Sequence, residues 1–403
     1  MARPRMFEEG EVLDRAAGVF GRRGYDGSTM GELTAAMGLN APSIYAAFKS
    51  KRGLFDAVLR RCGAREDEHR AWALAASTAE GVVERLLTTW PDEASSRVLT
   101  HSALAIGNEN ADIPPVLVHR RQQALVSLRE RFNAAKQVCD LPAGANTSKL
   151  ASFVMAVHDG LAMKAAAGAP VDDLRDAAEQ AVASWRAISD VAAVASVATG
   201  SSTRANGPGR ERRFDSDSAL DAAMKVFWTK GFNGASLTDL TEAMGITRPS
   251  LYAAFGSKEA LFFKALDLYQ CLSRDYIMAA LHEPTARGVF EALIRGTLKT
   301  QLTEGQPRGC LMVLNAMQGD DEAQPIRNEI LKRQAMGREM LAARFERAKR
   351  EGDVLATINI EGLVRLIQSL MNGILIQGAA GASADELSAL ADSSLTMWTA
   401  SAG

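Results

Sequence analysis

Residues 33–54 read LTAAMGLNAPSIYAAFKSKRGL, and residues 240–261 read LTEAMGITRPSLYAAFGSKEAL, the same pattern 207 positions later. The match extends without a gap from residues 3–59 to residues 210–266, where about 26 of the 57 positions are identical. A match of this length does not arise by chance. The chain therefore contains two copies of one structural unit.

The two copies are separated by a segment of different composition. Residues 199–209, TGSSTRANGPG, are rich in Gly, Ser, Asn and Pro, which is typical of an exposed connector. Later parts of the units also match, at an offset of 213, as Gly160 does with Gly373 and Trp185 with Trp398. We predict five segments: a head at 1–63, a helical regulatory domain at 64–198, a linker at 199–209, a second head at 210–270 and a second regulatory domain at 271–403.

The composition favours an all-α protein. Only 6% of the 403 residues are aromatic and 12 are proline, while the residues that cost least in a helix, such as alanine and leucine, are abundant. No segment has the two-residue period of a strand. The amino terminus lacks the apolar core of a secretory signal, and no stretch reaches the roughly 20 apolar residues of a membrane span. We expect a cytoplasmic protein without a membrane partner.

Charge, cysteine usage and motifs exclude several classes of site. The formal net charge is −2, whereas a general polyanion binder carries a large basic excess, so a nucleic-acid contact must come from local patches. Cys62, Cys139, Cys271 and Cys310 lack the spacing of a zinc site or a disulfide framework. The chain has no phosphate-binding loop, dinucleotide fingerprint or nucleophile elbow. We expect reduced thiols and no catalytic residue, metal or cofactor.

The repeated segment begins with an amphipathic helix in each unit. Leu13, Ala16 and Phe20 recur at the spacing of one helical face, and the second unit repeats this pattern. Glycine favours the left-handed conformation that ends many helices. Gly24 and Gly231 are therefore expected to end these two helices.

Two short helices and a longer one follow. The second helix is predicted over Met30–Met37, capped by Thr29 or Ser28, and Gly38 permits a tight turn because it adopts φ > 0 without a steric cost. The third helix is predicted over Ala41–Phe48, with a proline tolerated in its first turn. The fourth helix begins at Lys51, after Ser50 as its cap, and reaches about residue 66 or beyond.

A helix, a three-residue glycine turn and a second helix make a helix-turn-helix, in which the second helix enters the DNA major groove. The surrounding letters are specific: G-Y-x-x-S-T-M-x-x-L, then M-G-L-N-x-P-S-I-Y-x-x-F-x-S-K-x-x-L-F, and the second unit carries the same pattern. This run resembles the amino-terminal DNA-binding domain of the tetracycline-repressor (TetR/AcrR) family. The resemblance covers about 55 residues closely in each unit.

The resemblance implies a regulator with a three-helix DNA-binding head and a larger helical domain that binds a small ligand and dimerises. Ordinary members are homodimers whose two identical heads bind a near-palindromic operator. This chain instead holds two units covalently, so it resembles a tandem member of the family. We expect a monomeric pseudo-dimer or a homodimer, bound to double-stranded operator DNA at the bacterial nucleoid.

Candidate DNA-binding residues lie on the predicted recognition helices and at the starts of the neighbouring helices. In unit 1 they are Thr29, Asn40, Ala41, Pro42, Ser43, Tyr45, Lys49 and Lys51. In unit 2 they are Ser236, Thr247, Arg248, Pro249, Ser250, Tyr252 and Lys258. The tyrosines and lysines are expected to contact phosphate. Arginines 3, 5, 210 and 212 either lie along the minor groove or form a solvated tail.

The two recognition helices differ at positions that could contact bases. Arg248 can donate two hydrogen bonds to guanine, whereas Ala41 at the matching position offers only a methyl group. Asn40 and Lys49 also differ from their counterparts, Thr247 and Gly256. We therefore expect the two heads to prefer different half-sites in an asymmetric or imperfectly palindromic operator.

By the resemblance, a small-molecule effector would bind among the helices of a regulatory domain. Residues there that combine polar atoms with apolar surroundings are Trp90, His158, Met163, Met312, Asn315, Met371 and Gln377. Such residues more often belong to the hydrophobic core. His158 stands where the second unit has Met371, so the two cavities are expected to differ.

Three functional interpretations remain open. The first is a repressor that its ligand releases from DNA. The second is an architectural protein in which two chains display four heads and bridge DNA segments. The third is a thiol-based regulator in which Arg308 lowers the pKa of the nearby Cys310.

Overall fold

The computed structural model describes residues 8–89, 93–104, 113–191, 216–319, 323–396 and 398. The predicted linker, Trp90 and the arginines at positions 3, 5, 210 and 212 lie outside these residues. The described part is entirely helical, as predicted, and contains no strand. None of its helices is long and apolar enough to span a membrane.

The helices fall into two consecutive series, which we call unit 1 and unit 2. Unit 1 comprises α1 (Glu9–Gly27), α2 (Met30–Met37), α3 (Ala41–Phe48), α4 (Lys51–Leu74), α5 (Ala79–Thr88), α6 (Glu93–Leu104), α7 (Ile113–Gln137), α8 (Thr147–Ala166) and α9 (Val171–Val191). Unit 2 comprises α10 (Ser216–Gly234), α11 (Leu237–Met244), α12 (Arg248–Phe255), α13 (Lys258–Leu281), α14 (Ala286–Leu302), α15 (Leu311–Ala316), α16 (Gln324–Arg350), α17 (Ile360–Ala379) and α18 (Ala384–Thr396).

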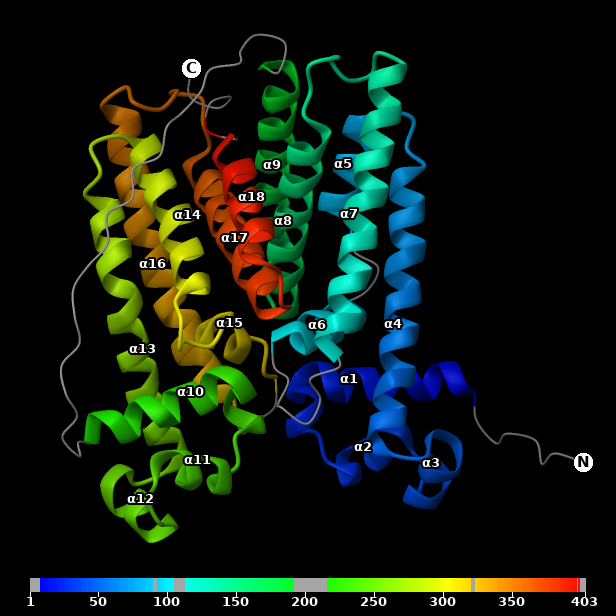
Figure 1. The fold of residues 1–403 in the computed structure, drawn as a ribbon, viewed down its shortest axis with the longest axis vertical. Coiled ribbons are helices and arrows are strands. Elements are labelled where there is room, and N and C mark those ends of the chain that lie inside the picture. The colour runs from blue at the N-terminus through cyan, green and yellow to red at the C-terminus, as the bar shows by residue number, and fades with distance from the viewer. Residues whose placement is uncertain are drawn as a thin grey trace, which may run out of the picture.

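Figure 1 shows the two units side by side, with α1–α3 and α10–α12 together at one end and the long helices rising from them. We call these groups head 1 and head 2. The helices α4 and α13 run without a break from the heads into the regulatory domains. The domain boundaries proposed after residues 63 and 270 therefore fall inside helices.

Local sequence accounts for the short helices of the heads. α2 and α3 have the predicted bounds, and Gly38 ends α2 with φ 65°. Gly24 and Gly231 interrupt the first helices as predicted, with φ/ψ of 71°/177° and 71°/172°, and a short helical turn then continues α1 to Gly27 and α10 to Gly234. The first-helix face predicted from the sequence is buried, and Ala16 and Phe20 are 0% and 1% exposed.

The two units pack through α8 and α17 in a reciprocal contact. A Cβ atom at Gly160 would overlap the carbonyl oxygen of Ser369, and a Cβ atom at Gly373 would overlap that of Ala156. Gly160 corresponds to Gly373, and Ala156 to Ser369, at the offset of 213. The same contact is therefore made twice, as in an isologous dimer interface. This confirms the predicted intramolecular pseudo-dimer.

The heads also contact each other and the domains above them. A Cβ atom at Gly27 would lie 3.0 Å from the Cβ atom of Asn233, so the ends of α1 and α10 are close. The backbone N–H of Gly319 in unit 2 donates to the carbonyl oxygen of Arg22 in unit 1, at 3.3 Å. The relative placement of the two heads is thus held by contacts across the pseudo-dimer.

Candidate nucleic-acid interface

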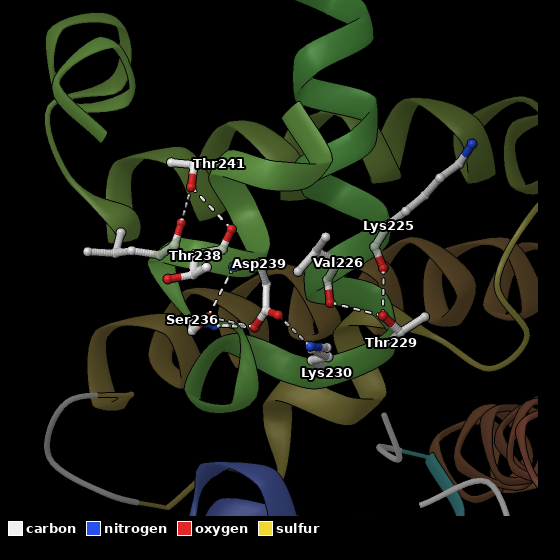
Figure 2. Close-up of polar contacts among 9 residues, drawn as sticks. Lys225, Val226, Thr229, Lys230, Ser236, Thr238, Asp239 and Thr241 are labelled. Atoms are coloured by element: carbon white, nitrogen blue, oxygen red, sulfur yellow. Dashed lines mark hydrogen bonds and ion pairs between the residues drawn. The ribbon is translucent and has the colours of Figure 1, made fainter. Parts of the chain in front are cut away.

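The helix before each recognition helix starts with a capping box. In head 2, the Ser236 hydroxyl accepts from the Asp239 N–H at 3.0 Å, and the Asp239 carboxylate accepts from the Ser236 N–H at 2.9 Å (Figure 2). Lys230 of α10 pairs with Asp239 at 2.7 Å, which contributes to a lowered pKa of this partly buried carboxyl. Thr29 and Glu32 make the same box in head 1. The hydroxyls of Thr29 and Ser236 therefore already have carboxylate partners.

The recognition helices are α3 and α12, and the residue before each one caps it. The Asn40 side-chain oxygen accepts from the Ser43 N–H at 2.9 Å, and the Thr247 hydroxyl accepts from the Ser250 N–H at 3.4 Å. Side-chain caps of this kind stabilise a helix by about 1 kcal/mol. These two predicted contacts thus also define where each recognition helix begins.

Each recognition helix buries one face and presents the other. Ile44 and Leu251 are 0% exposed, whereas Tyr45 and Tyr252 are both 46% exposed. Pro42 and Pro249 are exposed in the first turns, with Ser250 exposed and Ala41 and Ser43 partly buried beside them. The predicted contact residues of each recognition helix therefore share one outer surface, as a groove-binding helix requires.

Arg248 lies at the exposed start of α12 and donates to the Thr238 hydroxyl of α11 at 2.8 Å. This contact holds the guanidinium beside the start of the neighbouring helix. Gly31 and Ala41 occupy the two matching positions in head 1, so head 1 has neither partner. Thr238 was not among the predicted contact residues, although its place in the first turn of the helix next to the recognition helix could have indicated it.

Lys51 and Lys258, which are predicted to contact phosphate, are partly buried and lie against aromatic rings. Their ammonium groups lie 4.5 Å from the Tyr25 ring centre and 4.4 Å from the Phe232 ring centre. Burial lowers the pKa of Lys51, against the opposing effect of Asp26. A cation held on an aromatic ring gains about 0.5–2 kcal/mol, which leaving the ring for a phosphate would forfeit.

Lys49 follows α3 with φ 71°, a backbone conformation that favours glycine, and its counterpart Gly256 has φ 81°. Lys49→Gly should therefore raise the free energy of unfolding by about 1 kcal/mol. The same change removes an exposed cation beside the recognition helix, so operator affinity should fall. Denaturant unfolding and DNA titration measure the two effects, with Gly256→Lys as the reverse change. Gly256→Lys should lower the free energy of unfolding, and a change of the same sign in both variants would contradict the strain argument.

Both heads are anchored to the regulatory domains, but through different side chains. In unit 2, the Asn315 amide oxygen accepts from the Phe232 N–H at 2.7 Å, and its amide nitrogen donates to the Leu311 carbonyl at 2.8 Å. In unit 1, the buried His101 ring packs directly on Gly24. Asn315, predicted to contact a ligand, therefore holds head 2 through its amide oxygen, while its amide nitrogen bonds within its own helix α15.

Predicted ligand residues line several cavities among the described residues of the regulatory region. His158 lines a cavity of about 140 Å³, together with Glu66, Arg121 and Asp159; we call it the unit 1 cavity, although Ile376 and Ala380 of unit 2 also line it. Gln377 lines a cavity of about 130 Å³ between α7, α8 and unit 2. Met163 and Met371 line a larger one of about 380 Å³. Met312 is partly buried and packs against the core of unit 2.

The unit 1 cavity contains a group of interacting charges. Arg121 pairs with Asp159, and the His158 Nδ1 lies 3.6 Å from Asp159. Burial opposes protonation of His158, but its hydrogen bond with Asp159 and the charges of Glu66 and Asp159 outweigh burial, so its pKa is raised. Burial also raises the pKa of Glu66. A polar ligand can exchange hydrogen bonds with such groups.

The structure contradicts the predicted activation of Cys310. Burial raises the pKa of this thiol, and its sulfur accepts a hydrogen bond from the Tyr269 hydroxyl at 3.1 Å. Arg308 does not serve as its cation, because the guanidinium donates to the Ala382 carbonyl at 2.7 Å. A protonated thiol in this setting lacks the reactivity that an oxidant sensor needs.

Comparisons with known proteins agree with the duplicated heads. The family model described as "Bacterial regulatory proteins, tetR family" matches residues 12–58 and again residues 219–265. A second model, "Tetracyclin repressor-like, C-terminal domain", matches residues 289–391. The two matches to the amino-terminal model cover both heads at the predicted offset.

Individual relatives each match about half of the chain or less. The HTH-type transcriptional repressor ComR of Escherichia coli K12 is 29% identical over 192 residues, 47% of this chain and 91% of ComR. The repressor BdcR of the same organism is 37% identical over 116 residues, 28% of this chain and 58% of BdcR. A solved structure of the regulator CifR with 26-bp double-strand operator DNA is 37% identical, with a TM-score of 0.44, and the match covers 47% of this chain and 100% of CifR.

ComR and BdcR are both named as HTH-type transcriptional repressors. The resemblance seen in the sequence is thereby confirmed in both units. The chain belongs to the tetR family of bacterial regulatory proteins, with two copies of the family's amino-terminal domain in one polypeptide.

Proposed function

We propose that this protein is a transcriptional repressor that binds an asymmetric operator through two different heads and leaves it when a small molecule binds. The observation that supports the asymmetry is that Arg248 is exposed at the start of α12, whereas Ala41 occupies the matching position of α3. The scaffold of the two heads is shared, as the paired capping boxes and equally exposed tyrosines illustrate. The names of ComR and BdcR as repressors support the direction of regulation.

One chain should suffice for one operator. The reciprocal contact of α8 with α17 joins the units as a dimer interface would, and the covalent linkage keeps the units at a high effective concentration. We propose that the monomer acts in the cytoplasm on operator DNA. The alternative, two chains bridging two duplexes, is tested by light scattering of the DNA complex: one chain per duplex supports the pseudo-dimer, and two chains with two duplexes support bridging.

We place the effector in the unit 1 cavity, near Glu66, His158 and Asp159. The matching residues of unit 2 are Ser273, Met371 and Asn372, which lack these charges. A larger side chain also stands there, since Tyr276 occupies the position of His69, which lines the unit 1 cavity.

A route from this cavity to head 1 exists. Ser96 and Thr100 of α6 line the cavity, and His101 of the same helix packs on Gly24. A ligand that moves α6 would therefore alter the packing of head 1. Release follows if the ligand binds more tightly to the arrangement in which the heads no longer fit successive major grooves, about 34–36 Å apart.

Arg248→Ala tests the different specificities of the heads. A bidentate contact to guanine contributes about 1–3 kcal/mol of discrimination, so the variant should bind roughly 10–100-fold more weakly and lose preference in one half-site only. Footprinting and selection of bound sequences from random DNA measure this. The reciprocal variant Ala41→Arg should shift the other half-site toward that of head 2.

Lys225→Ala is a matched control, because this lysine of head 2 lies on α10 and pairs with Asp221 at 3.0 Å. It should leave the preference of both half-sites unchanged. If Arg248→Ala weakens both half-sites equally, the proposed asymmetric recognition is wrong.

A further inference from the structure

The cavity of about 380 Å³ lies where the two units meet, and its lining contains three cations together with the carboxylate of Asp173. Lys164 at the end of α8 comes from unit 1, and Arg338 of α16 and Arg365 of α17 come from unit 2. Figure 1 shows α8 beside α17 where the units meet, with α16 on the unit 2 side of α17. The volume falls within the range of small-molecule sites.

Only one of the three cations is matched by carboxylates. Arg365 donates to Asp173 and Asp176, both at 2.9 Å. Lys164 donates to the Arg365 carbonyl oxygen at 3.0 Å and reaches the Gln368 side-chain oxygen at 3.5 Å. Within the described residues, no carboxylate lies within ion-pair distance of Lys164 or Arg338.

This arrangement is electrostatically unfavourable without a counterion. Burial, followed by the charges of Arg338 and Arg365, lowers the pKa of Lys164 to about 7, although Asp173 acts in the opposite direction. A neighbouring anion would favour the charged lysine and offset the repulsion between the cations. The side-chain amides of Gln334 and Asn372 also line the cavity and can donate hydrogen bonds to an anion.

The pseudo-symmetry of the chain indicates that folding does not require these cations. At the offset of 213, Lys164 corresponds to Gln377, Arg338 to Leu125 and Arg365 to Ser152. These neutral residues line the smaller cavity of about 130 Å³ on the opposite side of the pseudo-dimer, where Arg121 and Glu386 also lie. The same backbone arrangement therefore forms without cations at the positions of Lys164, Arg338 and Arg365, so these three residues have a role other than folding.

We propose that this cavity binds a small organic anion, whose carboxylate or phosphate group lies between Lys164 and Arg338 and accepts hydrogen bonds from the neighbouring amides. The site is separate from the unit 1 cavity assigned to the effector, and its occupancy does not depend on DNA binding. The site recognises the anionic group of the ligand. The rest of the ligand must fit within the cavity of about 380 Å³.

Isothermal titration of the full chain at constant ionic strength tests the proposal, with succinate and inorganic phosphate as probes and succinamide as a neutral match for succinate. Succinate or phosphate should bind and succinamide should not; the tighter of the two anions identifies the kind of anionic group. The double variant Lys164→Gln/Arg338→Leu, which copies the residues of the opposite side, should bind roughly tenfold more weakly or worse.

Lys149→Gln/Lys332→Gln is the matched control, because these lysines are exposed on the same two helices, α8 and α16. It should leave anion affinity unchanged. Binding near pH 7 should also take up protons in the wild type and not in the double variant, as titrations in buffers of different ionisation enthalpy would measure. Absence of anion binding, equal affinity for succinamide, or undiminished affinity in a folded double variant would each overturn the proposal.

Discussion

Gly160→Ala should destabilise the protein by about 1–3 kcal/mol, although the same substitution in most helix interiors is favourable. The added methyl group would overlap the Ser369 carbonyl oxygen. A helix backbone cannot rotate away as a side chain can, so α8 and α17 must separate or the methyl group must strain both helices. Gly373→Ala meets the backbone of Ala156 in the same way and should have a similar effect.

Gly337→Ala is a suitable control for this prediction. Gly337 lies inside α16, and a Cβ atom there would have nothing within 4 Å. This substitution should raise stability by up to about 1 kcal/mol, because alanine has the better helix propensity. Denaturant unfolding measures the opposite signs, and small-angle scattering detects separation of the units. If Gly160→Ala is as stable as Gly337→Ala, the close helix contact is wrong.

Acidification from pH 7.5 to pH 5 should weaken folding by about 2 kcal/mol through His101 alone. Burial, with a smaller contribution from the charge of Arg97, lowers the pKa of His101 to about 4, from the usual 6.5 of a histidine in water. The ring lies against Gly24, and neither ring nitrogen has a hydrogen-bond partner among the described residues. Above pH 6.5 the His101 ring is neutral in both the folded and the unfolded protein. As the pH falls, the ring binds a proton first in the unfolded chain, where its pKa is higher. The stabilisation present above pH 6.5 is therefore lost progressively down to about pH 4.

The pH dependence of His101→Leu isolates this contribution. Its loss of stability between pH 7.5 and pH 5 should be smaller than that of the wild type by about 2 kcal/mol. The comparison must be made between variants, because the raised pKa of His158 acts in the opposite direction. His119→Gln is the control, since this histidine is exposed. Parallel pH profiles for the wild type and His101→Leu would refute the assignment.

The heads could be predicted closely because the determining interactions are local. Caps lie within three residues of the groups they satisfy, as Thr29 with Glu32 and Asn40 with Ser43, and these place α2 and α3 at the predicted bounds. The buried and exposed faces of α3 follow from a helical period of 3.6 residues. The same caps and the same helical period occur again in the second unit, so each prediction could be made twice.

The environment of individual side chains could not be predicted in the same way. Lys51 packs on Tyr25, and Cys310 bonds to Tyr269 across 41 residues of sequence. Asn315 holds head 2 through the Phe232 N–H, a partner that precedes it by 83 residues. A pKa or a hydrogen-bond partner depends on which segments become neighbours, and residue spacing along the chain does not specify this.

By itself, the sequence determined the helical fold, the duplication, the positions of the recognition helices and their divergence at Ala41 and Arg248, since these depend on caps, periodicity and residue identity over short spans. Only the tertiary structure decided that Gly160 and Gly373 make a reciprocal contact and that Lys164 and Arg338 line the same cavity. It also decided that Cys310 is buried, which raises the pKa of its thiol. These features arise where helices from distant parts of the chain approach, and packing sets both their distances and their exposure to water.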